Sequence, residues 1–177
     1  TPRSSSAASD VYKRQTDGHT KIIAETIAQH LSENYCADIV RIADSQTFPL
    51  DHYDLIIIGA SIRYGKFKPE LYSFIDQHMS LLDSKKSAFF GVNAVARKSA
   101  KNTPETNPYM QKFLKKTSWT PQTQGVFGGK IDYPKYQFID KYMIRFIMWI
   151  TNGPTDISQS FEFTNWNDVE AFARKLY

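Results

Sequence analysis

The chain has 177 residues, of which 41% are hydrophobic, and this is enough apolar material for one domain with a full core. Lysine and arginine total 22 against 18 aspartates and glutamates, so the formal net charge of +4 gives only a mild preference for anionic partners. The single cysteine, Cys36, excludes an internal disulfide and any cluster held by several cysteines, and it suits a reducing cytosol.

In chain order, the hydrophobic pattern alternates between helical and strand-like periods. It predicts helices over 19–34, 69–82, 106–116 and 166–176, and strands over 37–42, 53–61, 87–93 and 123–129. Thr20 and Asn165 are expected to cap the first and last helices. Continuous apolar strands separated by amphipathic helices predict an α/β fold whose central parallel sheet is covered on both faces.

In such a sheet, ligands bind outside the carboxyl ends of the strands, and three of these ends carry suitable residues. The stretch TDGHT at 16–20 combines two hydroxyls, a glycine and a helix N-terminus, which favours a phosphate. GASIRYG at 59–65 and GVNAVARK at 91–98 offer small residues beside Ile62, Tyr64 and Val95, which could flank a flat ring. One phosphate loop and two ring-flanking loops predict a mononucleotide site, and FMN is its commonest occupant.

Four stretches together resemble one family, the flavodoxin-type, quinone-dependent protoporphyrinogen IX dehydrogenases of bacterial haem synthesis. They are TDGHTKIIA, IIIGASIRYGKFKPEL, SAFFGVNAVARKSAKNTPETNPYMQKFL and DYPKYQFIDKYMIRFIMWITNG. The resemblance implies a flavodoxin-like three-layer sandwich with a long insertion between the last strand and the last helix. It further implies an FMN enzyme that oxidises protoporphyrinogen IX to protoporphyrin IX in two-electron steps. The electrons would pass to menaquinone or ubiquinone at the inner face of the cytoplasmic membrane, where a cytoplasmic, peripheral protein is expected.

The resemblance also implies which residues bind FMN. They are Thr16, Asp17, Gly18, His19 and Thr20 around the phosphate, and Ala60, Ser61, Ile62, Arg63, Tyr64, Gly65, Asn93, Ala94, Val95, Ala96 and Arg97 around the ring. No side chain is assigned as catalytic, because the flavin carries the chemistry. No metal site is expected, since His30, His52 and His78 share no ligand-like spacing.

The beginning of the chain departs from the family pattern. An apolar first strand ending in a hydroxyl residue is expected there, but DVYKRQ at 10–15 offers only Val11 and Tyr12 as apolar residues. We therefore expect residues 1–15 to be a non-native or disordered leader, followed by the FMN-binding domain at 16–177. Weak FMN binding is the expected consequence.

The segment at 130–150 interleaves basic and aromatic residues, and on a helix one face carries Ile139, Tyr142, Met143, Phe146 and Ile150. One interpretation is a surface helix that contacts the membrane and admits porphyrinogen and quinone. The other is an ordinary core helix or an oligomer contact. The most apolar window, 142–150, is shorter than the roughly 20 residues that a spanning helix needs.

Other residues leave alternatives open. Arg63 and Tyr64 either steer a propionate or cap their loop, and Arg97, Lys98 and Lys101 either bind porphyrinogen carboxylates or form a solvated basic cluster. The rival functions are an NAD(P)H:quinone oxidoreductase and a flavodoxin-type electron carrier, although such carriers are usually acidic. The chain has no recognisable nucleic-acid-binding motif, so no nucleic-acid partner is expected.

Overall fold

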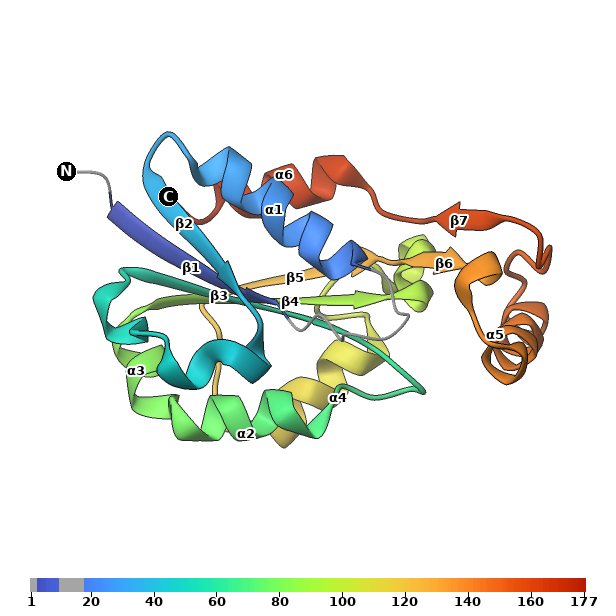
Figure 1. The fold of residues 1–177 in the computed structure, drawn as a ribbon, viewed down its shortest axis with the longest axis horizontal. Coiled ribbons are helices and arrows are strands. Elements are labelled where there is room, and N and C mark those ends of the chain that lie inside the picture. The colour runs from blue at the N-terminus through green and yellow to red at the C-terminus, as the bar shows by residue number, and fades with distance from the viewer. Residues whose placement is uncertain (1–2, 10–17) are drawn as a thin grey trace.

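A sheet of five parallel strands occupies the centre of the molecule. The computed structural model describes residues 3–9 and 18–177, with side chains placed for 18–45 and 48–177. The strands lie in the order β2-β1-β3-β4-β5 (Figure 1). Their bounds are β1 Arg3–Ser9, β2 Tyr35–Val40, β3 Leu55–Ser61, β4 Lys86–Asn93 and β5 Thr123–Gly128. Each neighbouring pair in this sheet is parallel, as the sequence pattern predicts.

Helices cover both faces of the sheet. One face carries α1 (His19–Leu31) and α6 (Trp166–Arg174), and the other carries α2 (Pro69–Gln77), α3 (Met79–Ser84) and α4 (Pro108–Lys116) (Figure 1). Alternate residues of β3 serve the two layers, because successive side chains of a strand point to opposite faces. Leu55 and Ile57 join the hydrophobic cluster of α1 and α6, whereas Ile56 and Ile58 join that of α2 and α4. The predicted three-layer sandwich is confirmed.

The first and last predicted helices end earlier than expected, at Leu31 and Arg174. The other two differ from their expected bounds for local reasons. The helix predicted over 69–82 is divided at His78, which leaves helical geometry with φ −110° and ψ 15°. The helix predicted from residue 106 begins at Pro108, because the Asn107 side chain accepts hydrogen bonds from the N–H groups of Tyr109 and Met110. An asparagine cap followed by proline is a typical helix start.

The first strand lies earlier in the chain than the family pattern suggested. Residues Arg3–Ser9 form β1 between β2 and β3, so they pair on both sides although their sequence, RSSSAAS, contains no large apolar residue. Backbone pairing on two sides satisfies the N–H and C=O groups whatever the side chains are. The residues 10–15 that were expected to hold this strand lie outside the described residues. That residues 1–15 are a non-native leader stays a prediction.

An insertion extends the domain beyond the carboxyl ends of the strands (Figure 1). It contains α5 (Phe138–Ile150) and two short antiparallel strands, β6 (Lys130–Asp132) and β7 (Ser160–Glu162). Ile131, Tyr133 and Met148 form its own small hydrophobic cluster. Short 3-10 turns complete the fold at Ile42–Thr47, Leu50–His52, Ala94–Arg97, Ser99–Lys101 and Tyr133–Lys135. None of the helices in the described part of the chain combines the length and apolar character needed to cross a bilayer.

Candidate functional site

The start of α1 and two of the loops predicted to bind a ligand lie at the same edge of the sheet. Ser9 of β1 lies beside Gly59 of β3, Ser61 beside Val92 of β4, and Asn93 beside Gly128 of β5. The start of α1 and the loops after β3 and β4 therefore meet at the carboxyl edge (Figure 1). This edge collects all the site residues expected within the described ranges, whereas Thr16 and Asp17 lie outside those ranges.

The N-terminus of α1 offers N–H groups to an anion. Gly18, and not the expected Thr20, is its N-cap residue; no side chain among the described residues caps the helix, and the first turn contains no acidic residue. Among the described residues outside its chain neighbours, no atom lies within 4 Å of the position that a Cβ on Gly18 would occupy. The first N–H groups of a helix lack partners within it, and the helix dipole adds positive potential there. These features match the binding of a phosphate.

His19 follows at the first position of this helix and is buried, with 3% of its surface exposed. Its Nε2 lies 2.5 Å from the Thr164 hydroxyl, which itself donates to the carbonyl of Gly128 at 2.7 Å. Because that hydroxyl already uses its proton, Nε2 must be the donor to Thr164. The other ring nitrogen, Nδ1, is buried and has no hydrogen-bond partner among the described residues. Burial lowers the pKa of His19.

An unpartnered buried nitrogen costs stability, so this atom marks a place where a ligand fits. In the neutral ring Nδ1 accepts a hydrogen bond, as from a hydroxyl of a ribityl chain. In the protonated ring it donates one, as to a phosphate. The His19 side chain is therefore suited to the polar half of a flavin mononucleotide in either protonation state.

The loop after β3 forms a tight two-residue turn. Arg63 and Lys66 exchange two backbone hydrogen bonds, at 3.0 and 3.2 Å, around Tyr64 and Gly65. Both central residues have positive φ, 49° for Tyr64 and 76° for Gly65, which is type I′ geometry. A bulky residue with positive φ is unusual, and such positions concentrate at functional sites.

The side chain of Tyr64 is 58% exposed at this edge and is held in place at its tip. Its hydroxyl donates to Asp140 of α5 at 2.6 Å, and Arg63 lies 3.7 Å from the same carboxylate. The Arg63 guanidinium also lies 5.3 Å from the centre of the Tyr64 ring. These contacts leave the ring as a fixed, solvent-facing aromatic surface.

The loop after β4 is organised by buried amides. Asn93 accepts a hydrogen bond from the N–H of Ala96 at 3.0 Å and another from Asn107 at 3.2 Å. Arg97 donates to the carbonyl of Ala94 and to both the carbonyl and the hydroxyl of Thr151, at 2.8 to 2.9 Å. The Arg97 guanidinium therefore holds the end of α5, and its burial lowers its pKa.

Two of the expected site residues belong to the hydrophobic core. Ala60 and Ala96 are buried, with exposures of 2% and 6%, in the cluster between the sheet and α2 and α4. Their side chains point into that core, so only their backbone groups remain for a ligand. Within residues 18–177, no group of three or more His, Cys, Asp or Glu side chains is arranged to hold a metal ion.

Sequence reasoning missed three residues that shape this edge, namely Thr164, Asp140 and Thr151. Thr164 contacts a histidine 145 positions earlier in the chain, so no local pattern could point to it. Asp140 and Thr151 read as ordinary helix-end residues, yet they tie α5 to the two loops expected to flank the ring.

Comparisons with known proteins agree with this fold. A family model described as a flavodoxin domain matches residues 12–158. A Leishmania major protein named protoporphyrinogen IX dehydrogenase (quinone) is 46% identical over 160 residues, covering 89% of this chain and 69% of the relative. The Escherichia coli K12 protein of the same name is 39% identical over 161 residues, covering 90% and 89%. The solved Trp repressor binding protein from Bacillus subtilis has a TM-score of 0.53 at 14% identity, covering 98% of this chain and 97% of its own, and it shows the shared fold alone.

Proposed function

The chain belongs to the flavodoxin-type family of protoporphyrinogen IX dehydrogenases (quinone), and from this premise we propose that it oxidises protoporphyrinogen IX to protoporphyrin IX with bound FMN. Electrons would then pass to menaquinone or ubiquinone. The observation that carries the proposal lies at the edge where two further loops meet. Among the described residues, no side chain caps the N-terminus of α1, and Nδ1 of His19 beside it has no hydrogen-bond partner.

The residues at this edge have distinct roles in the proposal. Backbone N–H groups of Gly18, His19 and Thr20 hold the phosphate, and the loops at 62–65 and 93–97 lie on either side of the ring. Bound FMN supplies a two-electron acceptor that a quinone can reoxidise. The protein positions the ring, with the fixed aromatic surface of Tyr64 at the entrance.

The exposure of α5 supports a peripheral membrane contact. Seven of its large hydrophobic residues are exposed, and they are Phe138, Ile139, Tyr142, Phe146, Ile147, Trp149 and Ile150. The apolar face predicted for this helix therefore points outward, and the interpretation as a core helix is wrong for it. A helix with an exposed apolar face and basic neighbours suits the boundary between headgroups and acyl chains. We place the protein in the cytoplasm, on the inner face of the cytoplasmic membrane, where an apolar quinone is available.

An anaerobic assay tests the reaction. Protein reconstituted with FMN is mixed with protoporphyrinogen IX and a quinone, and porphyrin fluorescence is followed over time. We expect fluorescence to rise faster than in matched samples that lack FMN or quinone. A flavin that is reduced by NADPH, with no porphyrin formed, would instead identify an NAD(P)H:quinone oxidoreductase.

The membrane contact is tested separately by flotation with liposomes. We expect the wild type to float with the vesicles and a variant carrying Ile147→Glu and Trp149→Glu to remain in solution. Equal flotation of both proteins would exclude α5 as the contact. Because both residues are exposed, FMN binding should be retained by the variant and serves as its folding control.

A further inference from the structure

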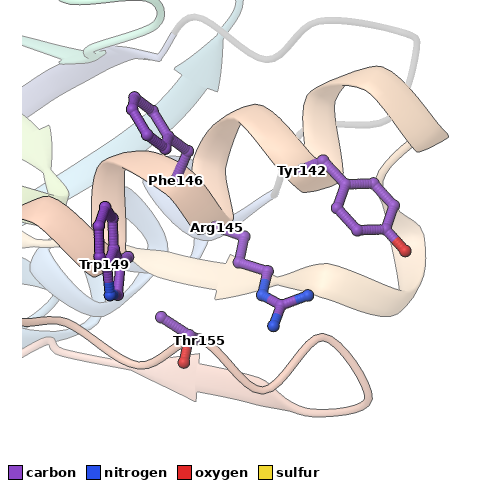
Figure 2. A pocket seen from close by; sticks show the side chains of 5 residues that line it. All are labelled: Tyr142, Arg145, Phe146, Trp149 and Thr155. Atoms are coloured by element: carbon purple, nitrogen blue, oxygen red, sulfur yellow. The ribbon is translucent and has the colours of Figure 1, made fainter.

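A cavity of about 420 Å³ lies against α5, within the range of about 300–1,000 Å³ that small-molecule sites occupy. Its lining residues are Tyr142, Arg145, Phe146 and Trp149 of α5, and Thr155 of the following segment. Figure 2 shows the guanidinium of Arg145 extending away from α5, with Tyr142 on one side and Trp149 and Thr155 on the other. The cavity thus places one cation among aromatic side chains.

The charge of Arg145 is available to a ligand. No acidic side chain in the described ranges forms an ion pair with it, whereas the carboxylates of the insertion are engaged elsewhere. Asp132 binds Ser160 and Lys135, and Asp156 binds Ser158 and Gln159. Asp140 binds Tyr64 and Arg63 at the carboxyl edge of the sheet. An anion from outside the chain is therefore the partner that complements Arg145.

The side of α5 on which the cavity lies indicates where that anion comes from. Residues three or four apart share one face of a helix, so Asp140, Ile144, Met148 and Thr151 form the inward side of α5. Asp140 and Thr151 contact the ring-flanking loops, and Met148 is buried in the insertion's cluster. Tyr142, Phe146 and Trp149 lie on the opposite, exposed side. The cavity consequently faces away from the flavin loops and toward whatever covers the apolar face.

We propose that this cavity binds the phosphate of an anionic phospholipid when α5 lies on the bilayer, a proposal that rests on the membrane contact above. The guanidinium of Arg145 pairs with the phosphate through two parallel N–H groups, a geometry that lysine cannot reproduce. Tyr142 and Trp149 lie at the depth of the headgroups, where these two residue types are enriched in membrane proteins. Phe146 reaches the acyl chains.

Vesicle flotation of the FMN-loaded protein tests the proposal. The vesicles contain either phosphatidylcholine alone or equal parts of phosphatidylcholine and phosphatidylglycerol. We expect the wild type to prefer the anionic vesicles and Arg145→Gln to bind them more than about fivefold more weakly, because about fivefold is already the general effect of one basic residue near such a surface. Binding to pure phosphatidylcholine should hardly change, because the apolar face is intact.

Matched variants separate a phosphate site from general charge. Lys141→Gln removes the same charge from the same helix, and Lys112→Gln removes it from an exposed position on α4. Both should weaken anionic binding less than Arg145→Gln does. Arg145→Lys keeps the charge but loses the planar fork, so it should lie between Arg145→Gln and the wild type. Unchanged FMN binding by all four variants shows that they fold.

The contrary outcomes are distinct. If Arg145→Gln binds anionic vesicles as the wild type does, the phosphate site is wrong although the membrane contact stands. If the wild type binds no vesicle, the membrane contact itself fails, while porphyrin formation in the anaerobic assay remains an independent measure of the enzyme. If Arg145→Gln instead weakens protoporphyrin IX binding without lipid, or changes the oligomeric state, the cavity belongs to a tetrapyrrole or to a second copy of the chain.

Discussion

At the scale of single residues, the environment of His19 is the most informative. The ring is buried, one nitrogen is committed to Thr164, and the other has no partner within the described residues. Burial disfavours the charged ring and lowers its pKa from the usual 6.5; the charge of Glu162 raises this pKa, and that of Lys130 lowers it. The unfolded chain therefore binds a proton at a higher pH than the folded protein does.

This difference predicts acid sensitivity. Below pH 6.5 the unfolded state takes up protons first, so the free energy of unfolding should fall as the pH decreases toward the folded pKa of His19. His78, whose pKa burial also lowers, acts in the same direction. His19→Gln keeps a donor toward Thr164 but does not titrate, so its stability should depend less on pH. Urea unfolding of both proteins at several pH values measures this, and parallel curves would contradict it.

At the scale of elements, the chain passes close to the end of β5 where it returns from the insertion toward α6. Phe163 of this returning segment packs tightly against Gly128. A Cβ on Gly128 would lie 2.1 Å from the carbonyl oxygen of Phe163, a backbone atom that cannot move aside. The neighbouring Gly129 has room, since its nearest contact would be a methyl group of Val92 at 3.4 Å. The carbonyl of Gly128 accepts a hydrogen bond from the Thr164 hydroxyl, and this hydroxyl also contacts His19.

A pair of alanine substitutions tests that close approach. Gly128→Ala should destabilise the protein by about 1–3 kcal/mol, the usual cost of forcing extra atoms into a packed site. Gly129→Ala should change stability by less than about 0.5 kcal/mol. Thermal and urea unfolding report both values. Similar stability of the two variants would mean that the chain is not packed against Gly128 in solution.

At the scale of the whole molecule, the sheet with its helices and the insertion have separate hydrophobic clusters. Polar contacts at the two ends of α5 join them, through Tyr64 and Asp140 at one end and Arg97 and Thr151 at the other. A unit with few buried apolar contacts opens locally at a lower free energy than the core of the domain. We therefore expect α5 to open before the sheet does.

Hydrogen exchange measured by mass spectrometry tests this order. Amides of α5 should exchange faster than those of β3 and β4 in the wild type. Arg97→Met removes the bonds to Thr151 and should speed α5 exchange by about tenfold, equivalent to roughly 1.4 kcal/mol for hydrogen bonds to a charged group. Exchange in β3 should stay the same. Uniform acceleration throughout the chain would show that the insertion and the sheet open as one unit.

The sequence alone determined the layered fold and the strand ends that lie at one edge of the sheet. The continuous apolar run in β3 indicates a strand covered on both faces, and the structure confirms this. The stretches at 60–65 and 93–97 were recognised from strand ends and lie at the expected edge. Such features can be predicted because a strand's period and a helix's start depend on residues adjacent in the chain.

Only the tertiary structure decided which distant residues meet and which face of α5 stays uncovered. The contacts of His19 with Thr164 and of Tyr64 with Asp140 join positions far apart, and the strand Arg3–Ser9 is defined by its neighbours rather than by its own side chains. Periodicity predicted an apolar face on α5 but not its exposure, because burial depends on what the rest of the chain places against a helix. The physical reason is that side-chain pattern is a local property, whereas burial and long-range hydrogen bonds depend on the packing of the whole chain.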